Sequence, residues 1–120
     1  MNFDKDIQDN TTIFGKILRG EIPAEKLYED DYVLAFKDIM PKARVHVLVI
    51  PKKCIQDLRV AGPEDAEILG HMMCKISEIA KLAGLDKGGF RIISNNGEHS
   101  GQEVPHLHLH LLGGEFLPKF

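Results

Sequence analysis

The stretch that decides the fold of this chain is His106-Leu107-His108-Leu109-His110-Leu111-Leu112. Successive side chains of a β-strand point to opposite faces of the sheet. A strand here therefore places the three imidazoles on one face and Leu107, Leu109 and Leu111 on the other. The leucine face suits a hydrophobic core, and the histidine face gathers several ring nitrogens in one small region. We therefore predict a strand over residues 104–112, with a functional site on its histidine face.

The rest of the chain divides into segments with helix and strand patterns on either side of a long helix. We predict a helix over 13–20, strands over 26–30, 32–38 and 45–51, a long helix that opens at 62–65 and ends near Gly84, a strand over 89–94, and a polar loop over 95–103. Short links between neighbouring strands favour an antiparallel meander that helices cover on one face, which is an α+β fold. Residues 1–10 are predicted to be a flexible N-terminal tail, and 11–120 a single domain.

Composition excludes several classes of protein. The formal net charge of −3 disfavours nonspecific nucleic-acid binding, so we predict no nucleic-acid partner. The chain has no run of about 18 apolar residues, and we predict no membrane association. The polar, acidic start MNFDKDIQDN does not read as a secretory signal, and Cys54 and Cys74 lack a C-x-x-C spacing. These features predict free thiols and a cytoplasmic protein.

Alternating histidines have three chemical interpretations: a metal site, exposed surface residues, or catalysis. Same-face neighbours on a strand lie roughly 7 Å apart, which makes it difficult for one ion with bonds of about 2 Å to take three ligands in a line. Glu103 and His46 are candidates for further ligands. Three imidazoles beside a polar glycine-containing loop are also unusual for a plain surface. We therefore favour catalysis with no metal and no cofactor, and keep the other two interpretations as alternatives.

The loop before the histidines suggests what the catalysis acts on. Glycines let a backbone approach an anion closely, and the N–H groups of Gly97, Gly101 and Gln102 are candidate donors to it. An imidazole nucleophile beside an anion-binding loop favours phosphoryl or nucleotidyl transfer, because nitrogen attack on phosphorus gives a discrete covalent intermediate. His108, the central histidine, is the predicted nucleophile.

The chain resembles the histidine triad (HIT) superfamily. The motif of that family, His-φ-His-φ-His-φ-φ with φ apolar, matches residues 106–112 at every position. The blocks 13–31, 34–53 and 101–114 resemble the Hint branch, the histidine triad nucleotide-binding proteins. This resemblance implies a HIT-like fold with a five-stranded antiparallel sheet and two helices. It also implies a homodimer in which two such sheets join into a single ten-stranded sheet.

The resemblance further implies a purine nucleoside phosphoramidase that releases a nucleoside monophosphate through a covalent nucleotidyl-histidine. His108 matches the nucleophile, and His46 is a further histidine beside the triad. His106 and His110 flank His108, orient its ring and contact phosphate oxygens. Asp38 matches the carboxylate that binds the ribose hydroxyls. The implied phosphate-site positions are Asn95, Gly101, Glu103 and Val104, and the implied base pocket consists of Ile13, Phe14, Ile17, Ile22, Phe36, Ile39 and Leu48.

Glu103 departs from the animal Hint proteins, which have a serine at this place. A carboxylate repels a phosphate unless it points away or is protonated. Glu103 could instead donate a proton to an amine leaving group, or contribute through its backbone N–H alone. Glu103 keeps open the alternative of a nucleotide-binding regulator with weak catalysis. Hydrolysis of dinucleoside polyphosphates is a second alternative.

Overall fold

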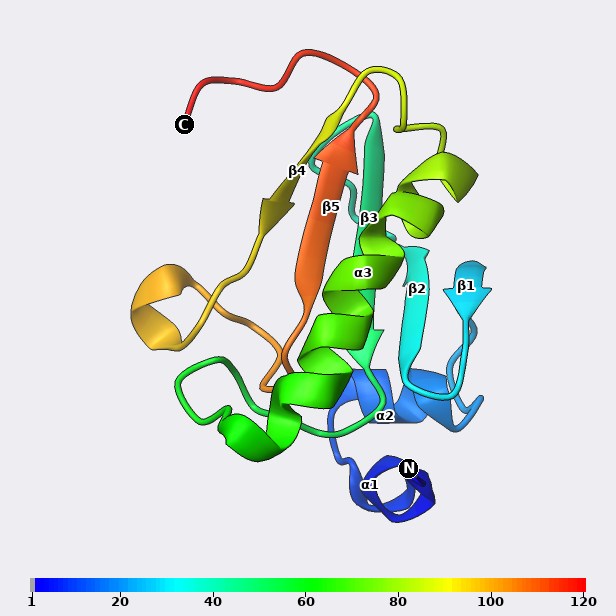
Figure 1. The fold of residues 1–120 in the computed structure, drawn as a ribbon, viewed down its shortest axis with the longest axis vertical. Coiled ribbons are helices and arrows are strands. Elements are labelled where there is room, and N and C mark those ends of the chain that lie inside the picture. The colour runs from blue at the N-terminus through cyan, green and yellow to red at the C-terminus, as the bar shows by residue number, and fades with distance from the viewer. Residues whose placement is uncertain (1) are drawn as a thin grey trace.

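The structure is a computed structural model that describes residues 2–120. It has one five-stranded sheet, three α-helices and two 3-10 turns (Figure 1). The elements in chain order are α1 (Asp4–Asp9), α2 (Ile13–Leu18), β1 (Lys26–Glu29), β2 (Val33–Lys37), β3 (Val45–Pro51), η1 (Pro63–Asp65), α3 (Ala66–Leu82), β4 (Phe90–Ile93), η2 (Glu98–Ser100) and β5 (Leu109–Gly113). No helix among the described residues combines the length and the apolar composition that crossing a membrane requires.

The five strands pair antiparallel in the order β1-β2-β3-β5-β4, which confirms the predicted α+β fold with a five-stranded antiparallel sheet. The sheet is not a simple meander, however. The chain leaves β3, passes through α3 to the edge strand β4, and returns as β5 between the two. The histidine strand is thereby inserted beside β3, so that His110 lies opposite Leu48 and diagonally from His46.

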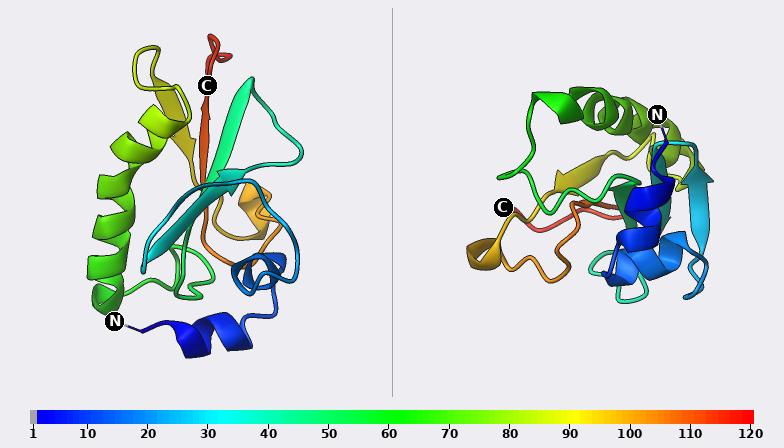
Figure 2. Two further views of the ribbon diagram at one scale, coloured as in Figure 1. Left: turned by 90° about the vertical axis from the view of Figure 1, so that its right-hand side faces the viewer. Right: turned by 90° about the horizontal axis from the view of Figure 1, so that it is seen from below.

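Helices cover both faces of the sheet, whereas the sequence predicts one covered face. The amphipathic helix α3 packs on one face, and the short helix α2 packs on the other (Figure 2). Leu107, Leu109 and Leu111 belong to the α3-side core, which also contains four residues that α3 buries, Ile68, Met72, Ile76 and Ile79. The alternation of leucine and histidine therefore separates core from site as predicted.

The strand over residues 104–112 is shorter than predicted and begins only at Leu109. Pro105 has no N–H to give to a ladder, and the amide of Leu107 donates to the carbonyl of Ile55 at 2.7 Å instead. The leucines of this segment still alternate with the histidines, so Leu107 and His106 are both fully buried, on opposite sides.

The predicted flexible tail over residues 1–10 also differs from the structure in its described part, residues 2–10. Asp4–Asp9 form α1, Phe3 is 7% exposed and packs edge-on against Tyr32, and Asn10 is 3% exposed. Arg19 holds this segment by donating hydrogen bonds to the carbonyls of Ile7 and Asn10. The N-terminus thus adds a third helix to the two that the sequence predicts.

Asp30 connects the turn between β1 and β2 to α3. Its carboxylate accepts hydrogen bonds from the amides of Tyr32 and Val33, from the Tyr28 hydroxyl at 2.7 Å and from Nε2 of His71 at 2.6 Å. Burial alone would raise the pKa of Asp30, but these hydrogen bonds outweigh it and lower the pKa from 3.8 to about 2.

We expect Asp30→Ala to lower the free energy of unfolding by about 2 kcal/mol at neutral pH, the equivalent of that pKa shift. Because the folded-state pKa is depressed, this stabilisation is present above pH 3.8 and is lost as the pH falls through about 2. Urea unfolding at several pH values should show the difference from the wild type shrinking in acid. Asp31→Ala, on the exposed neighbour, serves as the control, and a difference that does not change with pH would contradict this assignment.

Candidate active site

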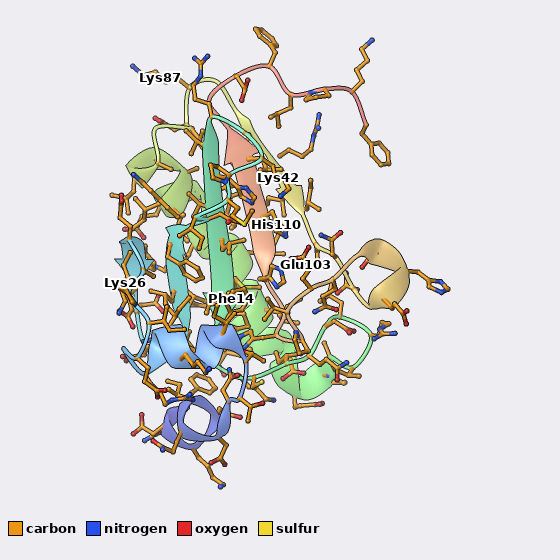
Figure 3. The ribbon with its side chains drawn as sticks, turned by 180° about the vertical axis from the view of Figure 1, so that it is seen from behind. Phe14, Lys26, Lys42, Lys87, Glu103 and His110 are labelled. Carbon is orange, nitrogen blue, oxygen red and sulfur yellow. The ribbon has the colours of Figure 1, made fainter. Side chains whose placement is uncertain are left out.

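His106, His108, His110 and His46 lie together on the sheet face opposite α3, above the apolar cluster formed with α2. Phe14 of α2 packs edge-on against the rings of His106 and His108, with ring centroids 5.7 and 5.0 Å apart. The rings of His108 and His110 are 5.0 Å apart. Figure 3 shows Phe14, Glu103 and His110 on this same face, with α3 behind the sheet.

His108 has a fixed ring orientation. Its Nδ1 lies 2.7 Å from the backbone carbonyl oxygen of His106, and because that oxygen can only accept, Nδ1 carries the proton. In the neutral ring the lone pair is therefore on Nε2. Nε2 makes no hydrogen bond to any described residue and is not fully buried. This is the arrangement that a nitrogen nucleophile requires.

In His110 the proton is on the other ring nitrogen, Nε2, and a chain of hydrogen bonds determines this tautomer. The amide of Lys42 donates to Nδ1 of His46 at 3.0 Å, so the proton of the neutral His46 ring is on Nε2. That N–H is 2.8 Å from Nδ1 of His110, which must accept it. The proton of neutral His110 is then on Nε2, where it can be donated to a phosphate oxygen.

Burial keeps these supporting imidazoles neutral. It lowers the pKa of His106 to about 4. Burial, together with the repulsion that protonated His108 or His46 would exert on a charged His110, lowers the pKa of His110 to about 4. The pKa of His46 is also lowered, chiefly by burial and against the attraction of Asp38.

We expect the ring resonances of His106 and His110 to stay those of neutral imidazoles in an NMR titration from pH 8 down to about 5. Since the unfolded chain takes up protons at these rings below pH 6.5 and the folded chain only near 4, folding stability should fall across that window. A titration midpoint near 6.5 for either ring would contradict the assignment.

His106 differs from its predicted role as a phosphate contact. It is fully buried, its Nε2 donates to the carbonyl of Pro51 at 2.8 Å, and its Nδ1 is 2.8 Å from Nδ2 of Asn10. Both ring nitrogens are therefore occupied within the chain. Its backbone carbonyl oxygen accepts the hydrogen bond from Nδ1 of His108.

Asp38, His46 and His110 approach closely enough to suit a metal ion, with one donor atom of each within 4.8 Å of the others. The two imidazole nitrogens of this group share a hydrogen bond at 2.8 Å, and the Asp38 carboxylate lies 3.5 Å from Nε2 of His46. The absence of a metal from the working protein stays a prediction, which activity in the presence of a chelator would test.

The structure brings together most of the predicted base pocket. Phe14, Ile17, Phe36 and Leu48 form one buried cluster, against which Ile22 and Val104 pack. Ile13 and Ile39 lie outside it, and the side chain of Ile39 is 90% exposed. The part that Ile13 and Ile39 play in a base pocket stays a prediction.

The loop over residues 95–103 contains the predicted glycine conformations but not the predicted donors. Gly97 and Gly101 both have positive φ, at 88° and 86°. Their amides and that of Gln102 are hydrogen-bonded within the loop, to the Gln102 side chain, to Glu98 and to Gly97. The amides of Glu103 and Val104, next to the histidines, donate to no protein group among the described residues. Asn95, at the start of the loop, is half-buried.

Four contributions to this site have no signal in the sequence. They are the amide of Asn10, the carbonyl of Pro51, the backbone N–H of Lys42, and the side chain of Gln102, which braces the loop through Gly97, Gln56 and Val104. Two of them are backbone groups, which do not depend on the type of side chain at Lys42 or Pro51. Only the fold brings them to the histidines.

Fold and site together define a histidine triad protein. The sequence pattern of the HIT domain family matches residues 19–117. The chain is 55% identical over 103 residues to an uncharacterised HIT-like protein of Synechocystis, covering 86% of this chain and 90% of that one. It is 46% identical to the purine nucleoside phosphoramidase of Escherichia coli, covering 86% and 87%.

A solved structure agrees with these sequence relatives. The histidine triad protein of Clostridium difficile superposes with a TM-score of 0.85 and 49% identity, over 90% of this chain and 94% of that one. The chain belongs to the HIT domain family.

Proposed function

We propose that this chain is a purine nucleoside phosphoramidase that acts through a covalent nucleotidyl-histidine at His108. The observation that carries the proposal is the free Nε2 of His108, held by its Nδ1–H bond to the carbonyl of His106 on the face that carries the apolar cluster. The 46% identity to the Escherichia coli purine nucleoside phosphoramidase supports the same substrate class.

In the first step Nε2 of His108 attacks the phosphorus of the substrate. A new N–P bond forms, the P–N bond to the leaving amine breaks, and the leaving nitrogen takes up a proton from solvent as the amine departs. In the second step water attacks the same phosphorus, the His108–phosphorus bond breaks, and the nucleoside monophosphate leaves as the water gives up a proton. His110 donates its Nε2–H to a phosphate oxygen in both steps, where negative charge develops.

The neighbouring groups suit the rest of a purine nucleotide. The apolar cluster around Phe14 and Phe36 offers a surface for a planar base. Asp38, which lies beside His46 and is half-buried, is the proposed acceptor for the ribose hydroxyls. The amides of Glu103 and Val104 are the proposed donors to the phosphate, so the exposed carboxylate of Glu103 need not touch it.

The test is a comparison of substrates with the wild-type protein. Adenosine 5′-phosphoramidate should be hydrolysed with a higher kcat/KM than diadenosine polyphosphates. The reverse preference would favour the dinucleoside polyphosphate hydrolase, and tight binding of a mononucleotide with negligible turnover of either substrate would favour the regulatory alternative. Both outcomes would contradict the proposal.

We also propose that the protein works as a homodimer with a ten-stranded sheet. β4 pairs only with β5 among the described residues, so its outer edge is available to a second copy, and Phe90 on this strand is 41% exposed. Light scattering should give twice the 13.4 kDa mass of the chain. A mass of 13.4 kDa at micromolar concentration would contradict the dimer.

A further inference from the structure

Asn10 is a buried polar residue between α1 and α2, outside the segment that the family pattern matches. Its amide orientation is fixed by the residues around it. The oxygen Oδ1 accepts from both the amide and the hydroxyl of Thr12, at 3.0 and 2.8 Å. The NH₂ group must therefore point the other way, where Nδ2 lies 2.8 Å from Nδ1 of His106.

The hydrogen bond from Asn10 can form with only one protonation state of the His106 ring. Nε2 of His106 donates to the carbonyl oxygen of Pro51, which can only accept, so the neutral ring has its lone pair on Nδ1. An amide NH₂ donates to that lone pair. Every other tautomer or charge state of His106 leaves a buried donor or acceptor unpaired, at a cost of about 1–3 kcal/mol.

His106 in turn positions the nucleophile. Its backbone carbonyl accepts the Nδ1–H of His108, and Phe14 packs against both rings. A rotated or charged His106 ring would shift this carbonyl or the packing of Phe14, and so the direction in which His108 Nε2 points.

We propose that Asn10 is a positioning residue that holds His106 as the neutral Nε2–H tautomer and so aligns His108 for attack. The proposal rests on the proposed function for the identity of the nucleophile. The groups that face the His106 ring are Asn10 from the α1–α2 link, Phe14 from α2, the carbonyl of Pro51 from β3, and the titratable ring of His108. No carboxylate of the described residues is hydrogen-bonded to His106.

The sharpest test is Asn10→Asp, which keeps the shape of the side chain and replaces the donor with an acceptor. With acceptors at both ring nitrogens, we expect nitrogen NMR at pH 7 to show His106 protonated at both, where the wild type shows Nε2–H alone. We expect kcat for adenosine 5′-phosphoramidate to fall about 10-fold or more, as for other residues that orient a functional imidazole, and KM to change less than twofold.

Arg19→Ala is the matched control for structural effects. Arg19 anchors the same segment through the carbonyls of Ile7 and Asn10 and does not touch His106. We expect it to lower stability while His106 remains the neutral Nε2–H tautomer. If Asn10→Asp leaves His106 in that tautomer, or if Arg19→Ala reproduces the doubly protonated ring, the proposal is wrong.

Asn10→Ala keeps the proposal testable if Asn10→Asp does not fold. It removes the donor without adding an acceptor, so kcat should fall and the His106 spectrum should show a mixture of tautomers. An unchanged kcat with a single tautomer would overturn the proposal. The NMR measurement does not depend on turnover. A wild type that hydrolyses no phosphoramidate would therefore refute the proposed function, while the NMR spectra of the variants would still test the His106 tautomer.

Discussion

The His108→Ala variant should lose hydrolysis of adenosine 5′-phosphoramidate by a factor of about 10⁴ or more, because removal of a nucleophile removes the covalent route itself. His108 is the imidazole of the site whose Nε2 is free and whose tautomer is set by a backbone carbonyl. A steady-state assay with the purified variant measures the loss, and mass spectrometry of wild-type enzyme quenched during turnover should find a nucleotidyl adduct on His108.

His99→Ala is the matched control, because His99 is an exposed histidine in η2. Its activity should equal that of the wild type. Circular dichroism and binding of the nucleoside monophosphate would show that His108→Ala is folded with a working pocket. Turnover that survives in His108→Ala, or an adduct on another histidine, would refute the assignment of the nucleophile.

Leu111→Ala should lower the free energy of unfolding by about 3 kcal/mol, within the range found for buried leucines. Leu111 is fully buried in β5, opposite Val47 of β3 and Ile92 of β4, and belongs to the core beneath α3. Truncation removes its apolar contacts and leaves a cavity that the two neighbouring strands cannot close. Urea unfolding monitored by circular dichroism measures the effect.

Leu82→Ala, on the 54% exposed leucine at the end of α3, is the control and should change stability by less than about 0.5 kcal/mol. Equal losses in the two variants would mean that Leu111 does not face the main core.

For residues 106–112, the sequence predicts which face of the sheet each side chain points to more accurately than it predicts where the strand begins. The alternation of His106 to Leu111 requires only an extended backbone, and the segment is extended before the ladder begins at Leu109. The start of the strand depends on hydrogen-bond partners, and Pro105 and the Leu107–Ile55 bond supply a different pattern there. Side-chain periodicity does not report on these partners.

The differences between the predicted and the observed site have one physical cause: the type of a residue does not determine which partners its polar groups meet in the fold. Gly97 and Gly101 have the conformations that glycine favours, yet their N–H groups are used inside the loop. His106 has the expected chemistry but no free nitrogen. Asn10 lies in a polar run that resembles a tail, and its partner is 96 positions away.

The predicted order of helices and strands likewise indicates only part of the strand pairing in the sheet. Short links predict which strands pair as hairpins, and β1, β2 and β3 do. The insertion of β5 between β3 and β4 depends on how α3 crosses the sheet, which local sequence does not encode. That insertion brings His46 and His110 within hydrogen-bond distance, 64 positions apart.

The strict alternation over residues 106–111 also constrains how this stretch can evolve. Substituting one leucine for another apolar residue, or changing one flanking histidine, alters a single position on one face. Inserting or deleting one residue upstream of Leu109 shifts the register, so that leucines replace imidazoles around Phe14 and charged or polar rings enter the core under α3. We therefore expect lineages of this protein to vary in residue type here but to keep the length of this segment unchanged.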